Sequence, residues 1–266
     1  HLVNHAVFKS LLFGCAGNIY YATHTKNIEE LGGLIKRLRV TAPLFLVGAL
    51  AISAIPPLNG FLSEWLIFQS ILNGFHIPSV IVKIITIICG AVVALTGALV
   101  ATCFVKAFGI SFLAMPRSDH AKKAKEVPVI MLVSMGLLAS LCVFLGIFPV
   151  KVMMVINSVN IHLLNTNILP AITSYDWLHT KSVQTNFTEI SPKSATVLGL
   201  MLLAVTFGVL TLIKPRFVKK IYETWTCGIS PEPRLEYTAT AFTRPFKTIF
   251  SNLYRPQSEV RTEYSV

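Results

Sequence analysis

Two sets of residues in this chain have types and spacings suited to proton transfer inside an apolar environment. Glu64 is a carboxylate within the apolar run ISAIPPLNGFLSEWLIF, residues 52–68. His1, His5 and Lys9 are spaced by four in HLVNHAVFKSLLF, so on a helix they form a row along one face over about 12 Å. Histidine titrates near neutral pH, and burial lowers the pKa of lysine toward the working range. We interpret both sets as candidate proton carriers.

Each set also has a structural explanation that the residues leave open. A carboxylate in hydrocarbon costs about 2–3 kcal/mol or more, but a simple proline kink would let Glu64 reach an interface or cap the kinked helix. A single buried lysine can extend its amine to the membrane surface, and a lone histidine can be a satisfied core group. Glu64 is nevertheless the only one of twelve Asp and Glu residues placed within an apolar segment.

The apolar run around Glu64 contains residues that interrupt a helix. Pro56 and Pro57 stand in its middle, and Asn59 and Gly60 follow. Proline lacks the backbone donor that a helix needs, and glycine tolerates the backbone angles of an unwound stretch. We expect two half-helices, about 42–55 and 61–74, joined by an unwound PPLNG. Broken helices of this kind mark ion sites in transporters.

The composition assigns the chain to the membrane proteins. Hydrophobic residues make up 53% and charged residues only 13%, whereas soluble domains average roughly 25% charged residues. The net charge of +11 does not indicate nucleic-acid binding, because the basic residues lie between apolar runs. The five cysteines have no metal-ligand spacing. We predict an all-α, polytopic membrane helical bundle with one discontinuous helix and no metal site.

Five segments are long and apolar enough to span a bilayer, which takes about 20 residues. Loops rich in Lys and Arg alternate with poor ones, and the rich side is cytoplasmic by the positive-inside rule. Lys83 and Lys106, near the ends of the third segment, are expected to reach the membrane surfaces. The predicted spans are 1–22, 41–74, 79–108, 128–149 and 194–213, and the basic loops are 23–40, 109–127 and the tail after 213.

The connection 150–193 contains a further helical pattern. Val152, Val155, Ile156, Val159 and Leu163 recur at helical spacing, which predicts an amphipathic helix at the outer membrane interface. We therefore divide the chain into proton-channel helices (1–149), an outer amphipathic segment with an extra span (150–213) and a cytoplasmic tail (214–266).

The quoted motifs resemble a known family. HLVNHAVFKSLLF, LGGLIKRL and PPLNGFLSEW are similar to the signatures of the antiporter-like proton-channel subunits of NADH:quinone oxidoreductases, cation/proton antiporters and membrane-bound hydrogenases. The resemblance places Lys9 on the channel lysine, His1 and His5 beside it, and Glu64 on the discontinuous helix. The tail ETWTCGISPEPRLEYTATAFTRPF (223–246) resembles the hydrogenase-4 component B and formate hydrogenlyase subunit 3 group.

The resemblance implies a role and partners. It implies a C-terminal portion of a proton-translocating subunit without a cofactor of its own, in a bacterial inner membrane. The partners would be protons, the bilayer, and other membrane and peripheral subunits that perform the redox chemistry. Two alternatives remain: a cation/proton antiporter subunit, which the tail disfavours, and a truncated structural subunit, which the retained His, Lys and Glu residues disfavour.

Overall fold

The computed structural model describes residues 1–165, 167, 192–213, 227–228 and 232–252. Every regular element in these ranges is a helix, which confirms the all-α prediction. The longer helices are α1 (Leu2–Thr23), α2 (Thr41–Ile52), α3 (Asn59–Asn73), α4 (Val80–Phe112), α6 (Val129–Ile147), α7 (Pro149–Leu164), α9 (Pro192–Ile213) and α10 (Ala239–Ile249). The short ones are η1 (Ile28–Glu30), η2 (Leu34–Lys36), η3 (Gly74–His76), α5 (Asp119–Lys123) and η4 (Pro233–Leu235).

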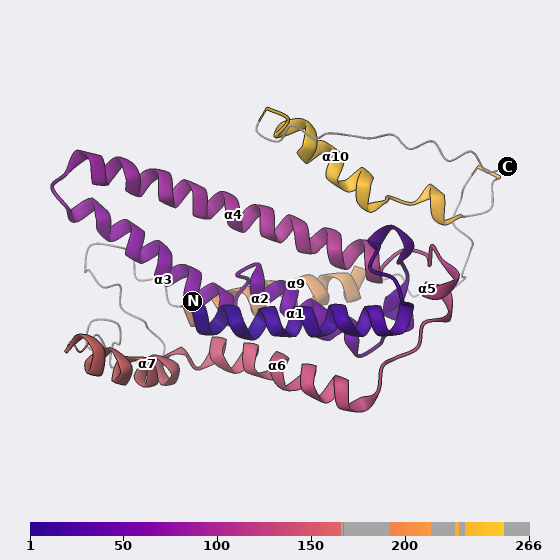
Figure 1. The fold of residues 1–266 in the computed structure, drawn as a ribbon, viewed down its shortest axis with the longest axis horizontal. Coiled ribbons are helices and arrows are strands. Elements are labelled where there is room, and N and C mark those ends of the chain that lie inside the picture. Colours follow the sequence, from indigo (N-terminus) through magenta and orange to yellow (C-terminus); the bar gives the residue numbers. More distant parts are fainter. Residues whose placement is uncertain (166, 168–191, 214–226, 229–231, 253–266) are drawn as a thin grey trace.

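The predicted discontinuous helix is present as α2 and α3, but the break differs from the expectation (Figure 1). Residues 53–58 are non-helical, while Asn59 and Gly60, expected to be unwound, begin α3 and are buried. The helix ends early because a residue before a proline is disfavoured in the helical region, and Pro56 and Pro57 cannot donate backbone hydrogen bonds. We call residues 53–58 the break.

Gly60 is required for packing rather than for unwinding. A Cβ atom at Gly60 would lie 1.8 Å from the Ala51 carbonyl oxygen, so the two half-helices approach each other backbone to backbone. On the other side, a Cβ at Gly146 of α6 would lie 2.0 Å from the Pro57 carbonyl oxygen. The break is therefore packed closely against protein at two points, while Ile55 within it is 42% exposed.

Helices α1, α2 and α6 lie side by side, and α4 covers one side of them after a turn from α3 (Figure 1). By length and apolar composition, α4 and α6 are the two described helices able to cross a membrane. The predicted third span extends four residues further than expected, to Phe112. Phe112 is fully buried with its ring centroid 5.3 Å from that of Phe45 and 5.1 Å from that of Phe108. This aromatic packing favours continuing the helix.

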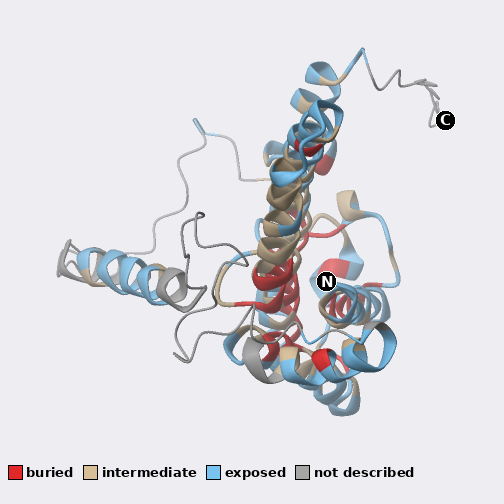
Figure 2. Ribbon diagram, turned by 90° about the vertical axis from the view of Figure 1, so that its left-hand side faces the viewer, coloured by how far each residue is buried: buried red, intermediate tan, exposed pale blue. Residues whose placement is uncertain are grey.

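The buried residues gather where α1, α2 and α6 face one another, and the outer faces are exposed (Figure 2). The centre is apolar, with Phe8, Leu11 and Cys15 of α1 almost completely buried. The start of α2 is held by a distant carboxylate: Glu126 accepts hydrogen bonds from the Val40 and Thr41 backbone N–H groups at 2.7 and 3.4 Å. This contact satisfies free donors at a helix start.

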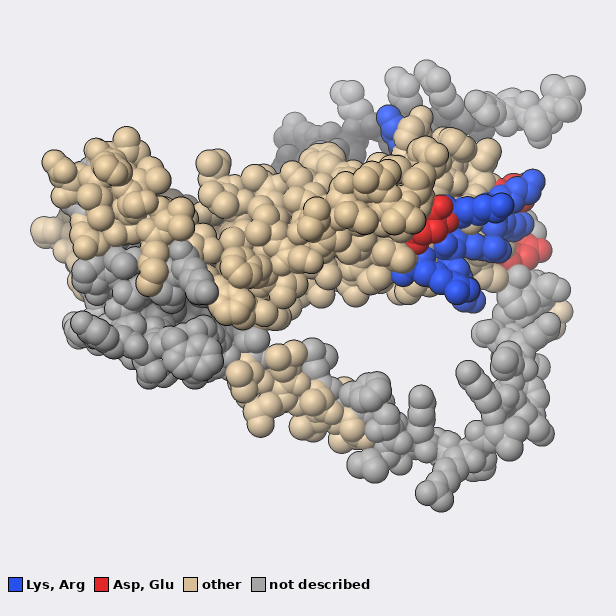
Figure 3. All heavy atoms as spheres, turned by 90° about the horizontal axis from the view of Figure 1, so that it is seen from below, with Lys and Arg blue, Asp and Glu red and all other residues tan. Residues whose placement is uncertain are grey.

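The described Lys and Arg side chains gather at one end of the face drawn in Figure 3. This end carries η2 and α5, with exposed lysines and arginines at positions 36, 37, 39, 122, 123 and 125. We call it the basic end. Gly33, with φ 64°, lets the loop reach α4: its N–H donates to the Leu113 carbonyl at 2.7 Å. The positive-inside rule predicts that the basic end is cytoplasmic.

The amphipathic helix expected in 150–193 is present as α7, and most of its apolar row is exposed, which suits the predicted interfacial position. Val155, Val159 and Leu163, expected on one apolar face with Val152 and Ile156, are strongly exposed. Asn157, expected on the polar face, is buried and its Nδ2 donates to Asn167 Oδ1 at 2.9 Å. The fifth predicted span is helical as α9.

The orientation predicts opposite accessibility for two cysteine substitutions. Lys122→Cys lies in α5 at the basic end, and Ser158→Cys lies in α7 beyond the far end of α6. Because α6 connects them, an impermeant maleimide added outside should label Ser158→Cys, and inside-out vesicles should reverse the result. Labelling of both from one side would contradict the orientation.

A second prediction tests the packing of the break with two substitutions on one helix. Gly146→Ala places a methyl group against the Pro57 carbonyl, whereas Gly136→Ala meets no atom within 4 Å. Overpacking of this kind costs about 1–3 kcal/mol, whereas alanine in open helix is neutral or stabilising by up to about 1 kcal/mol. Thermal unfolding of the purified protein should show a lower midpoint for Gly146→Ala alone. Equal midpoints would refute the close packing.

Candidate proton path

The predicted row of His1, His5 and Lys9 lies at the start of α1. The ring centroids of His1 and His5 are 5.8 Å apart, and the His5 centroid lies 5.3 Å from that of buried Phe8. Both histidines are exposed in this chain and Lys9 is half-buried. The spacing by four therefore places the two imidazoles next to each other, within reach of one bridging water.

The row contacts the broken helix through its first turn. His1 Nδ1 lies 2.9 Å from Ser63 Oγ of α3. Asn4 Nδ2 donates to the Asn59 carbonyl oxygen at 2.9 Å, and Asn59 Nδ2 reaches the Asn4 carbonyl at 3.4 Å. Asn4 and Ser63 were not among the predicted site residues. Their positions carried a signal: Asn4 lies in the histidine–lysine motif one turn after His1, and Ser63 precedes Glu64.

Glu64 lies in the second turn of α3 and is half-buried. It faces α4, because its Oε2 lies 3.9 Å from a Cβ built on Gly97. No hydrogen bond or ion pair joins Glu64 to another residue in the part of the chain that the structure describes. Ser63 and Glu64 therefore connect the break to two neighbours, α1 and α4.

Lys9 lines a cavity of about 330 Å³ on the other side of α1. Its Nζ lies 5.8 Å from the centroid of the Phe13 ring. The remaining lining is mainly apolar and comes from α1, α2, α4 and the loop after α1; it includes Phe45, Phe104, Lys26, Ile28, Leu31, Ala107 and Ser111. The break is not part of this lining, so the row meets the break at His1 rather than at Lys9.

The four residues predicted to form the helix break lie in two different elements. Pro56 and Pro57 lie in the non-helical segment, and Asn59 and Gly60 form the start of α3. Asn59 is completely buried, and its Oδ1 has no partner in the described part of the chain, as is also true of the nearby Trp65 Nε1. Buried polar groups usually bind protein or ordered water.

The described residues contain no group of three or more potential metal ligands.

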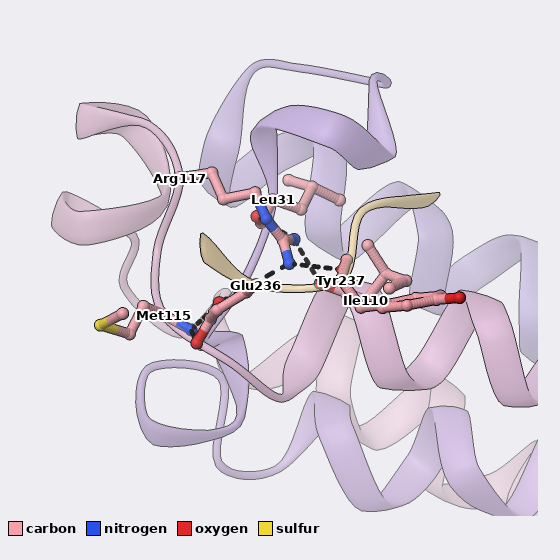
Figure 4. Close-up of polar contacts among 6 residues, drawn as sticks. All are labelled: Leu31, Ile110, Met115, Arg117, Glu236 and Tyr237. Atoms are coloured by element: carbon pink, nitrogen blue, oxygen red, sulfur yellow. Dashed lines mark hydrogen bonds and ion pairs between the residues drawn. The ribbon is translucent and has the colours of Figure 1, made fainter. Parts of the chain in front are cut away.

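The basic end holds a second polar cluster, centred on Arg117 (Figure 4). Arg117 Nη1 donates to the carbonyls of Leu31 at 3.0 Å and Ile110 at 3.1 Å. Arg117 Nη2 donates to the Tyr237 carbonyl at 3.3 Å and lies 3.7 Å from Glu236 Oε2. The arginine side chain is only 7% exposed. Arg117 therefore joins three segments that are distant in sequence.

Two further contacts hold the tail helix α10 to the basic end. Glu29 Oε1 accepts from the Thr240 N–H at 2.6 Å and from its hydroxyl at 2.5 Å. Lys106 Nζ donates to Thr243 Oγ1 at 2.8 Å, so this lysine, expected to reach the membrane surface, contacts the tail. The Thr240 hydroxyl is the main cause of the lowered pKa of Glu29, with smaller contributions from backbone N–H groups and Arg117.

Comparisons with known proteins place these features in a family context. Residues 1–93 match the family described as NADH:quinone oxidoreductase/Mrp antiporter, transmembrane. The chain is 35% identical over 266 residues to hydrogenase-4 component B of Escherichia coli K12, covering 98% of this chain and 38% of that protein. It is 31% identical over 254 residues to formate hydrogenlyase subunit 3 of the same strain, covering 94% of this chain and 38% of that protein.

An antiporter subunit and a solved structure are also similar. The chain is 34% identical over 156 residues to Na(+)/H(+) antiporter subunit A1 of Staphylococcus saprophyticus, covering 56% of this chain and 19% of that protein. A chain of the membrane-bound sulfane sulfur reductase, an archaeal respiratory membrane complex, matches with a TM-score of 0.68 and 23% identity, covering 94% of this chain and 38% of that one. This structural match supports the helical fold. The chain thus spans less than two fifths of the length of these relatives.

The lowered pKa of Glu29 predicts that acid loosens α10. A carboxyl group whose pKa is lowered on folding stabilises the contact above its ordinary value of 4.5, and this stabilisation is lost as the pH falls through the folded-state pKa. A spin label at Thr248→Cys should therefore become more mobile as the pH falls below 4.5. With Glu29→Ala added, which removes the acceptor of both Thr240 bonds, the label should be mobile throughout the range. Unchanged mobility of the first label from pH 7 to 3 would contradict this.

Proposed function

Residues 1–93 of this chain belong to the NADH:quinone oxidoreductase/Mrp antiporter transmembrane family, and from this premise we propose that the chain carries protons across the membrane within a hydrogenase-like oxidoreductase complex. The path runs along Lys9, His5 and His1 to the broken helix and Glu64. Electron transfer takes place in partner subunits, and this chain contributes proton transfer groups without a cofactor of its own.

The observation that carries the proposal is the polar connection between α1 and the break. His1 and Ser63 lie within hydrogen-bond distance, and Asn4 and Asn59 bond to each other beside them. Polar groups inside a membrane are costly unless they meet one another or water. The row of three titratable side chains gives His1 such a partner at the start of α3 and brings His5 next to His1.

The chemistry requires short steps between groups that bind and release protons. The 5.8 Å separation of the His1 and His5 rings is spanned by one water, which is nearly as favourable as a direct hydrogen bond. Ser63 Oγ lies next to His1, and its hydroxyl donates to the Gly60 carbonyl at 3.0 Å, so an onward step from Ser63 requires this hydroxyl to rotate. Asn59 Oδ1, which has no partner among the described residues, is a suitable site for ordered water beside the Asn4 and His1 contacts.

Glu64 has the environment of a group that changes its charge during transport. It is half-buried against the small Gly97 of α4, and no described residue fixes it in an ion pair. A carboxylate locked to an arginine would stay ionised, whereas one in a polar, partly dry site can hold a proton and release it. Proton binding and release by Glu64 would explain why a carboxylate stands in an apolar segment despite the unfavourable free energy of its burial.

The proposed location is a bacterial inner membrane, with the basic end in the cytoplasm. The proposed partners are the other membrane and peripheral subunits of the complex, including the electron-transfer subunits. The relatives hydrogenase-4 component B and formate hydrogenlyase subunit 3 are matched over nearly all of this chain, which includes the tail. This extent favours a hydrogenase-type complex.

A second candidate is a cation/proton antiporter subunit. The similarity to an Na(+)/H(+) antiporter subunit favours it, although that match covers only 56% of this chain. The two candidates differ in what accompanies proton movement. A redox subunit requires electron transfer for proton uptake into vesicles, whereas an antiporter releases protons in response to a sodium gradient alone.

Substitution of Glu64 and Lys9 tests the proposal. Glu64→Gln keeps size and hydrogen bonding but cannot ionise, and Lys9→Met removes the amine. In vesicles that hold the complete complex, each variant should assemble normally and lower proton translocation per assembled complex by about tenfold or more, since a positioned proton-transfer group contributes at least this much.

A matched control is Lys83→Met, which removes an exposed lysine near the start of α4 and should leave translocation unchanged. If Glu64→Gln translocates protons at the normal rate, then Glu64 is a structural cap and the proposed path is wrong. Sodium-driven proton release by the wild-type complex in the absence of electron donors would favour the antiporter.

A further inference from the structure

The tail binds the basic end at residues that stand next to the lining of the Lys9 cavity. On the loop, Glu29 holds Thr240, and its neighbour Ile28 lines the cavity. On α4, Lys106 holds Thr243, and its neighbour Ala107 lines the cavity. The tail therefore bonds to the two segments that supply these lining residues, the loop after α1 and the end of α4, without lining the cavity itself.

Arg117 connects the same two segments from beneath the tail. Its guanidinium binds the carbonyl of Leu31, itself a lining residue, and the carbonyl of Ile110, which precedes the lining residue Ser111. Glu236 of the tail pairs with this guanidinium and also accepts the Met115 N–H at 2.9 Å. Removing Glu236 would leave a nearly buried arginine without its counter-charge, which is strongly unfavourable.

From these contacts we infer that residues 232–243 form a strap that holds the loop 28–31 against the end of α4 and so limits access from the cytoplasm to the Lys9 cavity. Arg117 and Glu236 are positioning residues in this arrangement: they touch neither Lys9 nor the histidines but fix the walls of the chamber in which Lys9 lies. The inference rests on the proposed proton path for its purpose, but its geometry is independent of that path.

The strap is suited to controlled opening. The contacts that define it are a few polar bonds: Thr240 is exposed, Glu29 is partly exposed, and the Glu236 side chain is 25% exposed beside the nearly buried Arg117. Segments held in this way open locally at a lower free energy than the core. Loosening the strap would therefore widen the entrance to the cavity while the packing of α1, α2 and α6 stays intact.

The test measures access to the cavity separately from transport. Ser111→Cys, in a complete complex whose native cysteines in this chain are replaced, reports access through its rate of labelling by an impermeant maleimide from the cytoplasmic side. Glu236→Ala should raise this rate by roughly fivefold or more. Glu236→Gln keeps an acceptor for the Met115 N–H but not the charge, and should have an intermediate effect.

Thr248→Val is the matched control, because Thr248 lies on the same tail helix and its hydroxyl bonds only within α10, to the Arg244 carbonyl at 3.1 Å. It should leave the labelling rate unchanged. A Ser158→Cys reporter in α7 should be insensitive to all three tail substitutions. Equal labelling of Ser111→Cys in wild type and Glu236→Ala would overturn the inference.

Hydrogen exchange provides a second measurement that retains the native cysteines. In Glu236→Gln, amides of residues 28–31 and 107–112 should exchange several-fold faster, while those of residues 8–15 keep their protection. Loss of protection throughout would show unfolding instead of strap opening and would count against the inference. Faster exchange together with normal translocation by Lys9→Met would retain the strap and reject the proton path.

Discussion

A helix that stops inside an apolar segment leaves backbone donors and acceptors that lipid cannot satisfy, and the arrangement of this chain follows from that constraint. The break at residues 53–58 lies between close backbone contacts, at Gly60 of the second half-helix and at Gly146 of α6. Just after the break, Asn4 and His1 of α1 reach Asn59 and Ser63 of α3. This packing brings the start of the titratable row of α1 and the second half-helix together.

The polar and charged groups at the two ends of the bundle are satisfied in different ways. Near the break, polar groups meet one another within the protein, and Glu64 remains without an ion-pair partner among the described residues. At the basic end, charged side chains make hydrogen bonds to backbone groups. Glu126 accepts from the first N–H groups of α2, Arg117 donates to carbonyls of the loop and of α4, and Glu29 accepts from Thr240 of the tail. At the basic end the charges position the elements, whereas Lys9 and Glu64 lie half-buried and without an ion pair among the described residues.

The sequence predicted the fold class, the broken helix and the position of Glu64 because each depends on local chemistry. Consecutive prolines end a helix whatever its surroundings, and spacing by four places His1 and His5 together. The limits of the break were missed because Asn59 and Gly60 are selected by contacts with Asn4 and Ala51, which are distant in sequence. The burial of Asn157 in α7 was not anticipated for a similar reason, since it depends on packing and on the bond to Asn167. The roles of Arg117 and Glu236 could not be anticipated, as 119 residues separate the two partners of this ion pair.

The central claim is that Lys9, the two histidines and Glu64 are parts of one hydrated path through the break. A cryo-electron microscopy map of the intact complex, at a resolution that shows ordered water, tests it most directly. The account predicts a continuous series of waters that links Lys9 with His5 and His1 and then passes Ser63 and Asn59 to reach Glu64. Tightly packed apolar side chains between His1 and Glu64, with no water between them, would contradict it.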